Sequence, residues 1–252
     1  MAGSIDISIG SLLGLSAVLA GLSDTAELPI ACTAAVALAA GALGGWLNGW
    51  LAVRSKVHAI VITLGTMAIY RGLIVEWSDG RWILGLSDGL RDVAHGSLLG
   101  APFLLWAAIG AWIGVAILLR FSRFGRLIYA LGSDQQAARY VGVASHQILP
   151  WTFALCGLLI GAAGLLQAAR YGQVQTNAGL GFELKAIAAA VIGGVHIAGG
   201  RGSALGIALG TLLIGQLANA LVLLHVPAYW EGLFLGAVIL STLVLERGKD
   251  SQ

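Results

Sequence analysis

Apolar runs, separated by short polar segments, are the main pattern along this chain. Eight runs stand out between charged, glycine or proline residues: 11–22, 29–50, 57–76, 103–120, 148–169, 184–198, 202–224 and 227–246. A transmembrane helix needs about 20 mainly apolar residues, and six of these runs reach the usual length of roughly 17–25. Runs 11–22 and 184–198 are shorter. The pattern predicts an all-α, polytopic transmembrane helical bundle with about eight membrane segments, one or two of them short or broken.

Composition strengthens the membrane interpretation. The chain is 58% hydrophobic and only 10% charged, whereas a soluble domain carries roughly 25% charged residues. A net charge of +2 is too small to indicate a nucleic-acid partner. The two cysteines, Cys32 and Cys156, both lie inside apolar runs and are interpreted as small packing residues, not as a disulfide or metal pair.

The basic residues predict which side of the membrane each loop faces, because Lys and Arg near helix ends are retained in the cytoplasm. Nine fall in one set of loops or at its edges: Arg54, Lys56, Arg120, Arg123, Arg126, Arg139, Arg201, Arg247 and Lys249. Four fall in the opposite set: Arg81, Arg91, Arg170 and Lys185. The first set is therefore expected to be cytoplasmic, together with the C-terminus. The first residues show no secretory signal pattern.

Glycines four residues apart recur in the apolar runs, as in Gly41/Gly45/Gly49 and Gly202/Gly206/Gly210. Glycines at this spacing line one face of a helix and let two backbones approach closely. Close packing of helices within the subunit is the favoured interpretation, and pairing between subunits is the alternative.

Several kinds of enzyme site are excluded by the motifs. The sequence has no GxxxxGK[ST] phosphate-binding loop and no HExxH zinc motif. A GxSxG match at Gly85–Gly89 has no strand before it to form a nucleophile elbow, so it is interpreted as an external loop turn. The five histidines are scattered without ligand spacing. No catalytic residue, metal site or bound cofactor is predicted.

One long polar stretch, Arg126–Gln147, interrupts the apolar pattern. Its central part, Ser133–Tyr140, contains good helix formers, a plausible N-cap in Ser133 or Asp134, and Gly142 where a left-handed turn would end the helix. A short surface helix with an alanine pair and no apolar face suits docking into a cleft on a partner protein. An ordinary solvated loop helix is the alternative.

Four motifs, in order along the chain, resemble bacterial ABC importer permeases of the ribose/xylose type. The pattern Gly125-Arg126-x-x-Tyr129-Ala130-x-Gly132-x-x-x-x-Ala137-Ala138-x-x-x-Gly142-Val143 is similar to the cytoplasmic coupling loop of that family. The other matching elements are Gly3–Ser11, the pair Gly45–Gly49 and Ile62–Gly72, and the block Gly179–Ser203. The resemblance covers nearly the whole chain, and Asp79–Trp82 and Val222–Trp230 look most like its rhamnose and autoinducer-sugar branch.

The resemblance implies a permease of about ten transmembrane helices in the bacterial inner membrane. Such a permease pairs with a second copy or a sister permease, a periplasmic sugar-binding protein and an ATP-binding cassette subunit that holds the ATP and Mg. Against this family pattern roughly two spans are expected to be missing before Gly3, which a misassigned start or a truncation would explain. The whole of 1–252 is expected to form one permease domain, with 121–147 as the coupling loop within it.

Two sets of site residues follow from these motifs. The expected contacts with the ATPase are Gly125, Arg126, Tyr129, Ala130, Gly132, Asp134, Ala137, Ala138 and Gly142. The expected substrate pathway or gate consists of Asp6, Ser8, Ser11, Asn48, Thr63, Thr66, Glu183 and Asn219, with Gln167 and Gln216 as further polar groups inside apolar runs. A neutral sugar needs hydroxyl and amide partners, although each of these groups can equally form a helix–helix hydrogen bond.

Charged residues inside the membrane are costly, and two of them are ambiguous here. Asp6 either belongs to the pathway or gate or caps the first helix. Arg71 either extends toward the membrane surface or pairs with Glu76. A self-sufficient secondary transporter or channel is the alternative function, and Asp6 is its best candidate for an ion-coupling group.

Overall fold

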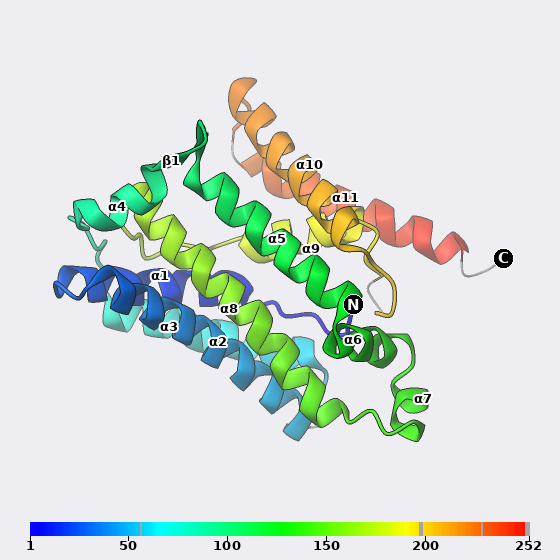
Figure 1. The fold of residues 1–252 in the computed structure, drawn as a ribbon. Coiled ribbons are helices and arrows are strands. Elements are labelled where there is room, and N and C mark those ends of the chain that lie inside the picture. The colour runs from blue at the N-terminus through cyan, green and yellow to red at the C-terminus, as the bar shows by residue number, and fades with distance from the viewer. Residues whose placement is uncertain (56, 197–198, 228, 250–252) are drawn as a thin grey trace.

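The computed structural model describes residues 1–55, 57–196, 199–227 and 229–249. In chain order the described elements are α1 Ile9–Thr25, α2 Ile30–Ser55, α3 Ala59–Trp77, α4 Asp88–His95, β1 Ser97–Leu98, β2 Ala101–Pro102, α5 Phe103–Phe121, α6 Arg123–Ser133, α7 Gln135–Tyr140, α8 Ser145–Tyr171, α9 Phe182–Ile192, α10 Ala204–Leu223 and α11 Tyr229–Lys249. Figure 1 shows α1, α2, α3 and α8 gathered on one side and α9, α10 and α11 on the other, with α5 between them.

Within the described residues, five helices are long and apolar enough to cross a membrane: α2, α3, α5, α8 and α10. The predicted polytopic helical bundle is confirmed, but the predicted number of about eight segments is not. α1 has 17 residues and α9 only 11. α9 is short because Gly193 and Gly194 follow it, the latter at φ +77, and the last two positions of the predicted span 184–198 lie outside the described residues.

The core forms where α1 lies against α2, α3 and α8. Leu12, Leu15 and Val18 of α1 are buried together with Ile74 of α3 and Leu90 of α4. α1 is therefore covered on most sides by protein. Its sequence is apolar all round, which is expected of a helix in the middle of a bundle.

The contact between α2 and α8 is the most extensive of all helix pairs. It is made through glycines: a Cβ atom on Gly41 or Gly45 of α2 would overlap the backbone of α8 at Gly157. Gly206 and Gly210 of α10 lie equally close to the backbone of α9. The interpretation of the glycine spacing as packing within the subunit is confirmed at these positions. Lys185 also joins α9 to α11, because its Nζ lies 2.7 Å from a Glu231 carboxylate oxygen.

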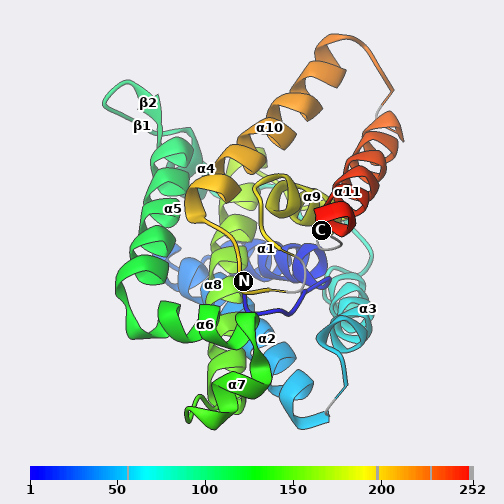
Figure 2. The ribbon, with the colours of Figure 1, turned by 90° about the vertical axis from the view of Figure 1, so that its right-hand side faces the viewer.

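Two ends of the molecule carry different elements (Figure 2). α6, α7 and the N-terminus lie at one end, while α4 and the β1–β2 hairpin lie at the other. α8 begins just after α7 and ends beside α4, and its 27 residues make a helix about 40 Å long. The first end is called the α7 end below, and the second is called the hairpin end.

The GxSxG match lies at the hairpin end and is a loop turn, as predicted. Ser87 is the N-cap of α4, a helix that the sequence did not predict, and its hydroxyl accepts a hydrogen bond from Leu90 N at 3.3 Å. The same hydroxyl donates to Asp24 Oδ1 at 2.6 Å, and Ser87 N donates to Asp24 Oδ2 at 2.6 Å. Asp24 is buried, so Ser87 fastens α4 to the end of α1.

Candidate functional site

The predicted coupling segment folds as two helices, not one. α6 ends at Ser133, and Asp134 then takes an extended conformation at φ −157 before α7 begins. The Asp134 carboxylate accepts hydrogen bonds from Gln136 N at 2.8 Å and Ala137 N at 2.9 Å. Of the two predicted N-caps, Asp134 is therefore the one that caps α7, and α7 occupies most of the predicted Ser133–Tyr140 stretch, whereas α6 before it was not predicted.

The surface of α7 is also less polar than predicted. Ala138 is 4% exposed and faces the chain itself, whereas Ala137 is exposed. Tyr140 and Val141 are 91% and 78% exposed at the end of the helix. The expectation of no apolar face is wrong, because these two side chains form an apolar tip. Gly142, at φ +82, makes the predicted left-handed turn directly after this tip.

α6 is anchored at both of its glycines. At Gly125 a Cβ would lie 2.5 Å from Leu118 O, so only glycine lets α6 fold back against the end of α5. Gly132 lies against the carbonyl of Met1, and a Cβ there would also lie 2.6 Å from Gly200 N. Both glycines of α6 are thus needed for close backbone contact.

A hydrogen bond ties α6 to the turn at 199–202. The Tyr129 hydroxyl donates to Gly202 O at 2.8 Å, and Gly200 N of the same turn donates to Met1 O at 2.9 Å. Burial raises the pKa of the Tyr129 hydroxyl, so this group keeps its proton and remains a donor at neutral pH. The other two residues of the coupling motif that lie in α6, Arg126 and Ala130, are exposed.

The first eight residues lead from α6 into the interior of the bundle. From Met1 to Ser8 the chain is non-helical, and α1 starts at Ile9 with Ser8 as its N-cap. Ile7 N donates to Thr63 Oγ1 of α3 at 3.2 Å, which holds this N-terminal segment against α3. The segment 1–8 therefore connects the 199–202 turn to the buried polar side chains at the start of α1.

A buried polar cluster lies at the start of α1 and joins α1, α2 and α3. The Asp6 carboxylate accepts from Ser8 N at 2.9 Å, from Ser8 Oγ at 2.7 Å and from Asn48 Nδ2 at 3.4 Å. Asn48 Nδ2 also donates to Ser8 Oγ at 2.7 Å. The Tyr70 hydroxyl lies 2.9 Å from Gly44 O and 3.1 Å from Asn48 Oδ1 and can donate its proton to either. Ser8 and Asn48 are fully buried and Tyr70 is 5% exposed.

The structure brings together five of the predicted pathway residues and adds one. Asp6, Ser8 and Asn48 are linked by the bonds above, Thr63 lies beside them through its bond to Ile7 N, and Thr66 Oγ1 donates to Thr63 O at 3.3 Å. Tyr70 was missed, although it follows Thr63 and Thr66 at the i, i+3, i+7 spacing that places residues on one face of a helix.

The remaining predicted pathway residues lie elsewhere. Ser11 is buried one turn into α1, next to the cluster. Glu183 accepts from Gly181 N at 3.3 Å at the start of α9. Asn219 and Gln216 are exposed on α10, apart from the cluster. Arg71 follows neither predicted alternative, because its Nη1 donates to Ala178 O at 2.9 Å.

A cavity of about 590 Å³ lies at the α7 end, below the polar cluster. Gly3 and Ser4 line it from the N-terminal segment, Gln135 and Arg139 from α7, and His58 from the turn before α3. Movement of α7 would therefore change the walls of this cavity directly. In the described part of the chain no group of three His, Cys, Asp or Glu side chains is placed to hold a metal ion.

Several apolar helices long enough to span a bilayer, an internal polar cluster and glycine-mediated packing define a polytopic membrane protein of the transport type. Residues 1–243 match the family described as "Branched-chain amino acid transport system / permease component", and the chain belongs to this family. The predicted membership in a family of transport permeases is confirmed.

Individual relatives are similar along nearly all of this chain. The autoinducer 2 import system permease protein LsrC of Escherichia coli is 40% identical over 245 residues, which cover 96% of this chain and 71% of the relative. LsrC of Shigella flexneri is 40% identical with the same coverage, and LsrC of Salmonella typhi is 39% identical over 96% of this chain and 70% of its own. No solved structure matched the chain.

Proposed function

We propose that this chain is the permease subunit of an ABC importer that carries a monosaccharide across the bacterial inner membrane. A rhamnose-like or autoinducer-type sugar is favoured, because relatives named for autoinducer 2 import are 39–40% identical to the chain. In this function the chain pairs with a second copy or a sister permease and receives the sugar from a periplasmic binding protein. An ATP-binding cassette subunit holds the ATP and Mg and supplies the driving force.

The observation that carries the proposal is that the α7 end combines an exposed helix with hydrogen bonds that lead from it into the bundle. α7 presents exposed Ala137 and Tyr140 to a partner, and Asp134 holds its first turn rigid. α6 passes any displacement to the 199–202 turn through Tyr129, and this turn bonds to Met1 at the head of the N-terminal segment. A push on α7 therefore has a continuous bonded route toward Asp6 and toward the walls of the 590 Å³ cavity.

The proposed topology places the α7 end in the cytoplasm. Arg123, Arg126 and Arg139 lie in α6 and α7, and Arg201 lies in the turn bonded to α6, so the basic residues gather at one end. The C-terminus is assigned to the same side. We assign α1, α9 and α11 as the further membrane segments of a single permease domain, in which 121–147 is the coupling loop.

The test is an Ala137→Trp substitution in the complex reconstituted with its ATP-binding subunit. The added ring blocks a docking surface without touching the interior of the chain, since Ala137 is exposed. We expect sugar uptake to fall about tenfold or more while ATP hydrolysis continues, because a clash in an interface costs more than ~1.4 kcal/mol.

A control variant and a measurement without the ATPase are needed to interpret the result. Gln136→Ala removes a small part of an exposed neighbouring side chain and should leave uptake unchanged. Ala138 is unsuitable for the test, because it is buried and a larger side chain would disturb the fold. Normal coupling in the Ala137→Trp complex would contradict the proposal, and uptake without any ATPase would favour a secondary transporter.

A further inference from the structure

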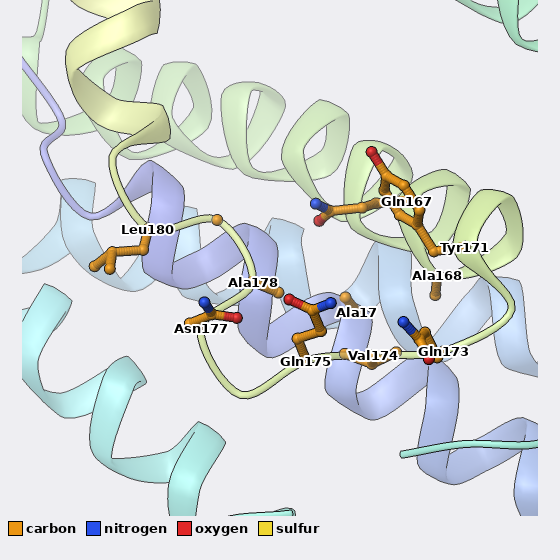
Figure 3. A pocket seen from close by; sticks show the side chains of 11 residues that line it. Ala17, Gln167, Ala168, Tyr171, Gln173, Val174, Gln175, Asn177, Ala178 and Leu180 are labelled. Atoms are coloured by element: carbon orange, nitrogen blue, oxygen red, sulfur yellow. The ribbon is translucent and has the colours of Figure 1, made fainter. Parts of the chain in front are cut away.

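A second cavity, of about 350 Å³, lies at the hairpin end (Figure 3). It is formed between the last two turns of α8 and the segment 172–181 that leads to α9, with Ala17 of α1 contributing one wall. This volume is within the range of small-molecule sites, about 300–1,000 Å³. Because α8 separates the two ends of the molecule, this outer cavity is on the opposite side of the bundle from α7.

The segment 172–181 is held in place although it is not helical. Val174 and Ile83 exchange two backbone hydrogen bonds, of 2.8 and 2.9 Å. A Cβ on Gly14 would lie 2.5 Å from Ala178 O, so glycine in α1 allows the segment to lie directly on that helix. Arg71 donates to the same Ala178 carbonyl from α3. The floor of the outer cavity is thus a fixed surface, positioned by α1 and α3.

The polar groups around the outer cavity are neutral and available. Gln173, Gln175 and Asn177 come from the segment, while Gln167 and Tyr171 come from α8 and lie across from them in Figure 3. No charged side chain lines the cavity. Within the described residues, none of these five side chains is hydrogen-bonded to the protein. Four carboxamides supply both donors and acceptors, which are the partners that sugar hydroxyls need.

Gln167 gives the sharpest indication of a missing partner. Its Oε1 atom is buried and makes no hydrogen bond within the described part of the chain. A buried acceptor without a partner is destabilising and is uncommon in native structures. A hydroxyl group in the outer cavity would satisfy this atom once the Gln167 carboxamide turns toward the cavity, because Oε1 itself has almost no accessible surface.

We propose that the outer cavity is a binding site for a neutral, polyhydroxylated molecule of monosaccharide size, where the substrate first contacts this permease. This inference rests on the proposed function, which places the hairpin end on the periplasmic side. The carboxamides of Gln167, Gln175 and Asn177 bind the hydroxyls, while Tyr171, 63% exposed, stands at the opening. The absence of lining charges makes the site selective against ionic solutes, since a bound ion would be without a counter-charge.

The experiment uses the complete importer in liposomes, with autoinducer 2 as the probe. Gln175→Ala and Asn177→Ala each remove a hydrogen-bond partner, and we expect each to raise the KM for uptake roughly fivefold with little change in maximal rate. Thr211→Ala is the control, because this polar residue is exposed on α10, away from the cavity, and the KM of this variant should not change.

A labelling measurement separates binding from a change in folding. In a background with Cys32→Ala and Cys156→Ala, Asn177→Cys is treated with a maleimide with and without the probe. We expect autoinducer 2 to slow labelling at Asn177→Cys but not at Ser97→Cys, an exposed position in the nearby hairpin. Ribose 5-phosphate, which carries charge, should protect neither position.

The possible failures are distinguishable. If the wild-type importer takes up autoinducer 2 while both alanine variants keep the wild-type KM and the probe gives no protection, the outer site is refuted and the proposed function stands. If the wild-type importer takes up neither autoinducer 2 nor rhamnose, the proposed import of such sugars is refuted, and the outer site is refuted with it.

Discussion

The two groups of polar side chains described above differ in whether their hydrogen bonds are already made. In the buried polar cluster, Asp6, Ser8 and Asn48 bond to one another, and Tyr70 bonds to the cluster or to Gly44 O. In the outer cavity, within the described residues, the carboxamides have no protein partner, and Gln167 Oε1 is buried without one. Both groups contain side chains suited to a sugar.

The difference separates a structural role from a binding role. Polar groups that are fully bonded inside a membrane protein hold helices together, and breaking them to accommodate a sugar costs as much as the new bonds would return. Unbonded groups around a preformed cavity carry no such cost. The polar cluster therefore positions α1, α2 and α3, and the outer cavity is the better place to bind a substrate.

The largest effect on stability is expected from Asp6→Ala. The substitution removes the acceptor for Ser8 and Asn48 inside the bundle, and the free energy of unfolding should fall by about 1–3 kcal/mol. Thermal unfolding in detergent measures this change. Asp6→Asn, which keeps an acceptor oxygen, should lose much less. Unchanged stability together with lost transport would instead assign Asp6 to the pathway or gate.

Thr63→Val should have the next largest effect. Valine has nearly the same shape but leaves Ile7 N without its partner, so we expect a loss of about 1 kcal/mol in the free energy of unfolding. Thr63→Ser keeps the hydroxyl and serves as the control. If serine and valine destabilise equally, the bond to the N-terminal segment contributes nothing.

Tyr70→Phe should destabilise the protein by only about 0.6 kcal/mol, the average for a helix–helix hydrogen bond in a membrane. The loss is small because the hydroxyl caps the cluster from outside and Asn48 keeps its bond to Ser8. Unfolding midpoints of the single variant and of Asn48→Ala with and without Tyr70→Phe would measure the coupling. Additive losses would show that Tyr70 acts mainly through Gly44 O.

The smallest effect on stability is expected in the outer cavity. Gln173→Ala removes a half-buried side chain that makes no hydrogen bond within the described residues, so the free energy of unfolding should change by less than about 0.5 kcal/mol. The same detergent unfolding assay applies. A loss as large as that of Thr63→Val would mean that this carboxamide supports the fold and would remove the contrast between the two groups.

Much of the fold could be predicted from the order of apolar runs, and less of the site. The five helices that are long enough to cross a membrane were each expected within a few residues, because their length alone makes them recognisable. α4 was missed because its eight residues are too short and polar to stand out in a hydropathy pattern. Asp134 was one of the two predicted N-caps of α7, but α6 before it was missed, because its mixed polar and apolar residues do not stand out in a hydropathy pattern.

For the candidate site, the sequence identified individual residues but not which of them contact one another. Asp6, Asn48 and Thr63 were each selected as polar residues in apolar surroundings, and the structure shows that Asp6 and Asn48 bond to each other while Thr63 bonds to Ile7 N beside them. Asn219 was selected for the same reason and lies apart from it. Gln173, Gln175 and Asn177 were not predicted as site residues, because polar residues are common in loops.

The sequence by itself determined that this protein is a helical membrane permease with a polar segment at one end, because length, apolarity and motif order are properties of the chain alone. Only the tertiary structure decided which polar groups are bonded and which are available. The physical reason is that a hydrogen bond depends on the distance between two groups, and bonded groups in this protein are as far apart in sequence as Arg71 and Ala178 or Met1 and Gly200.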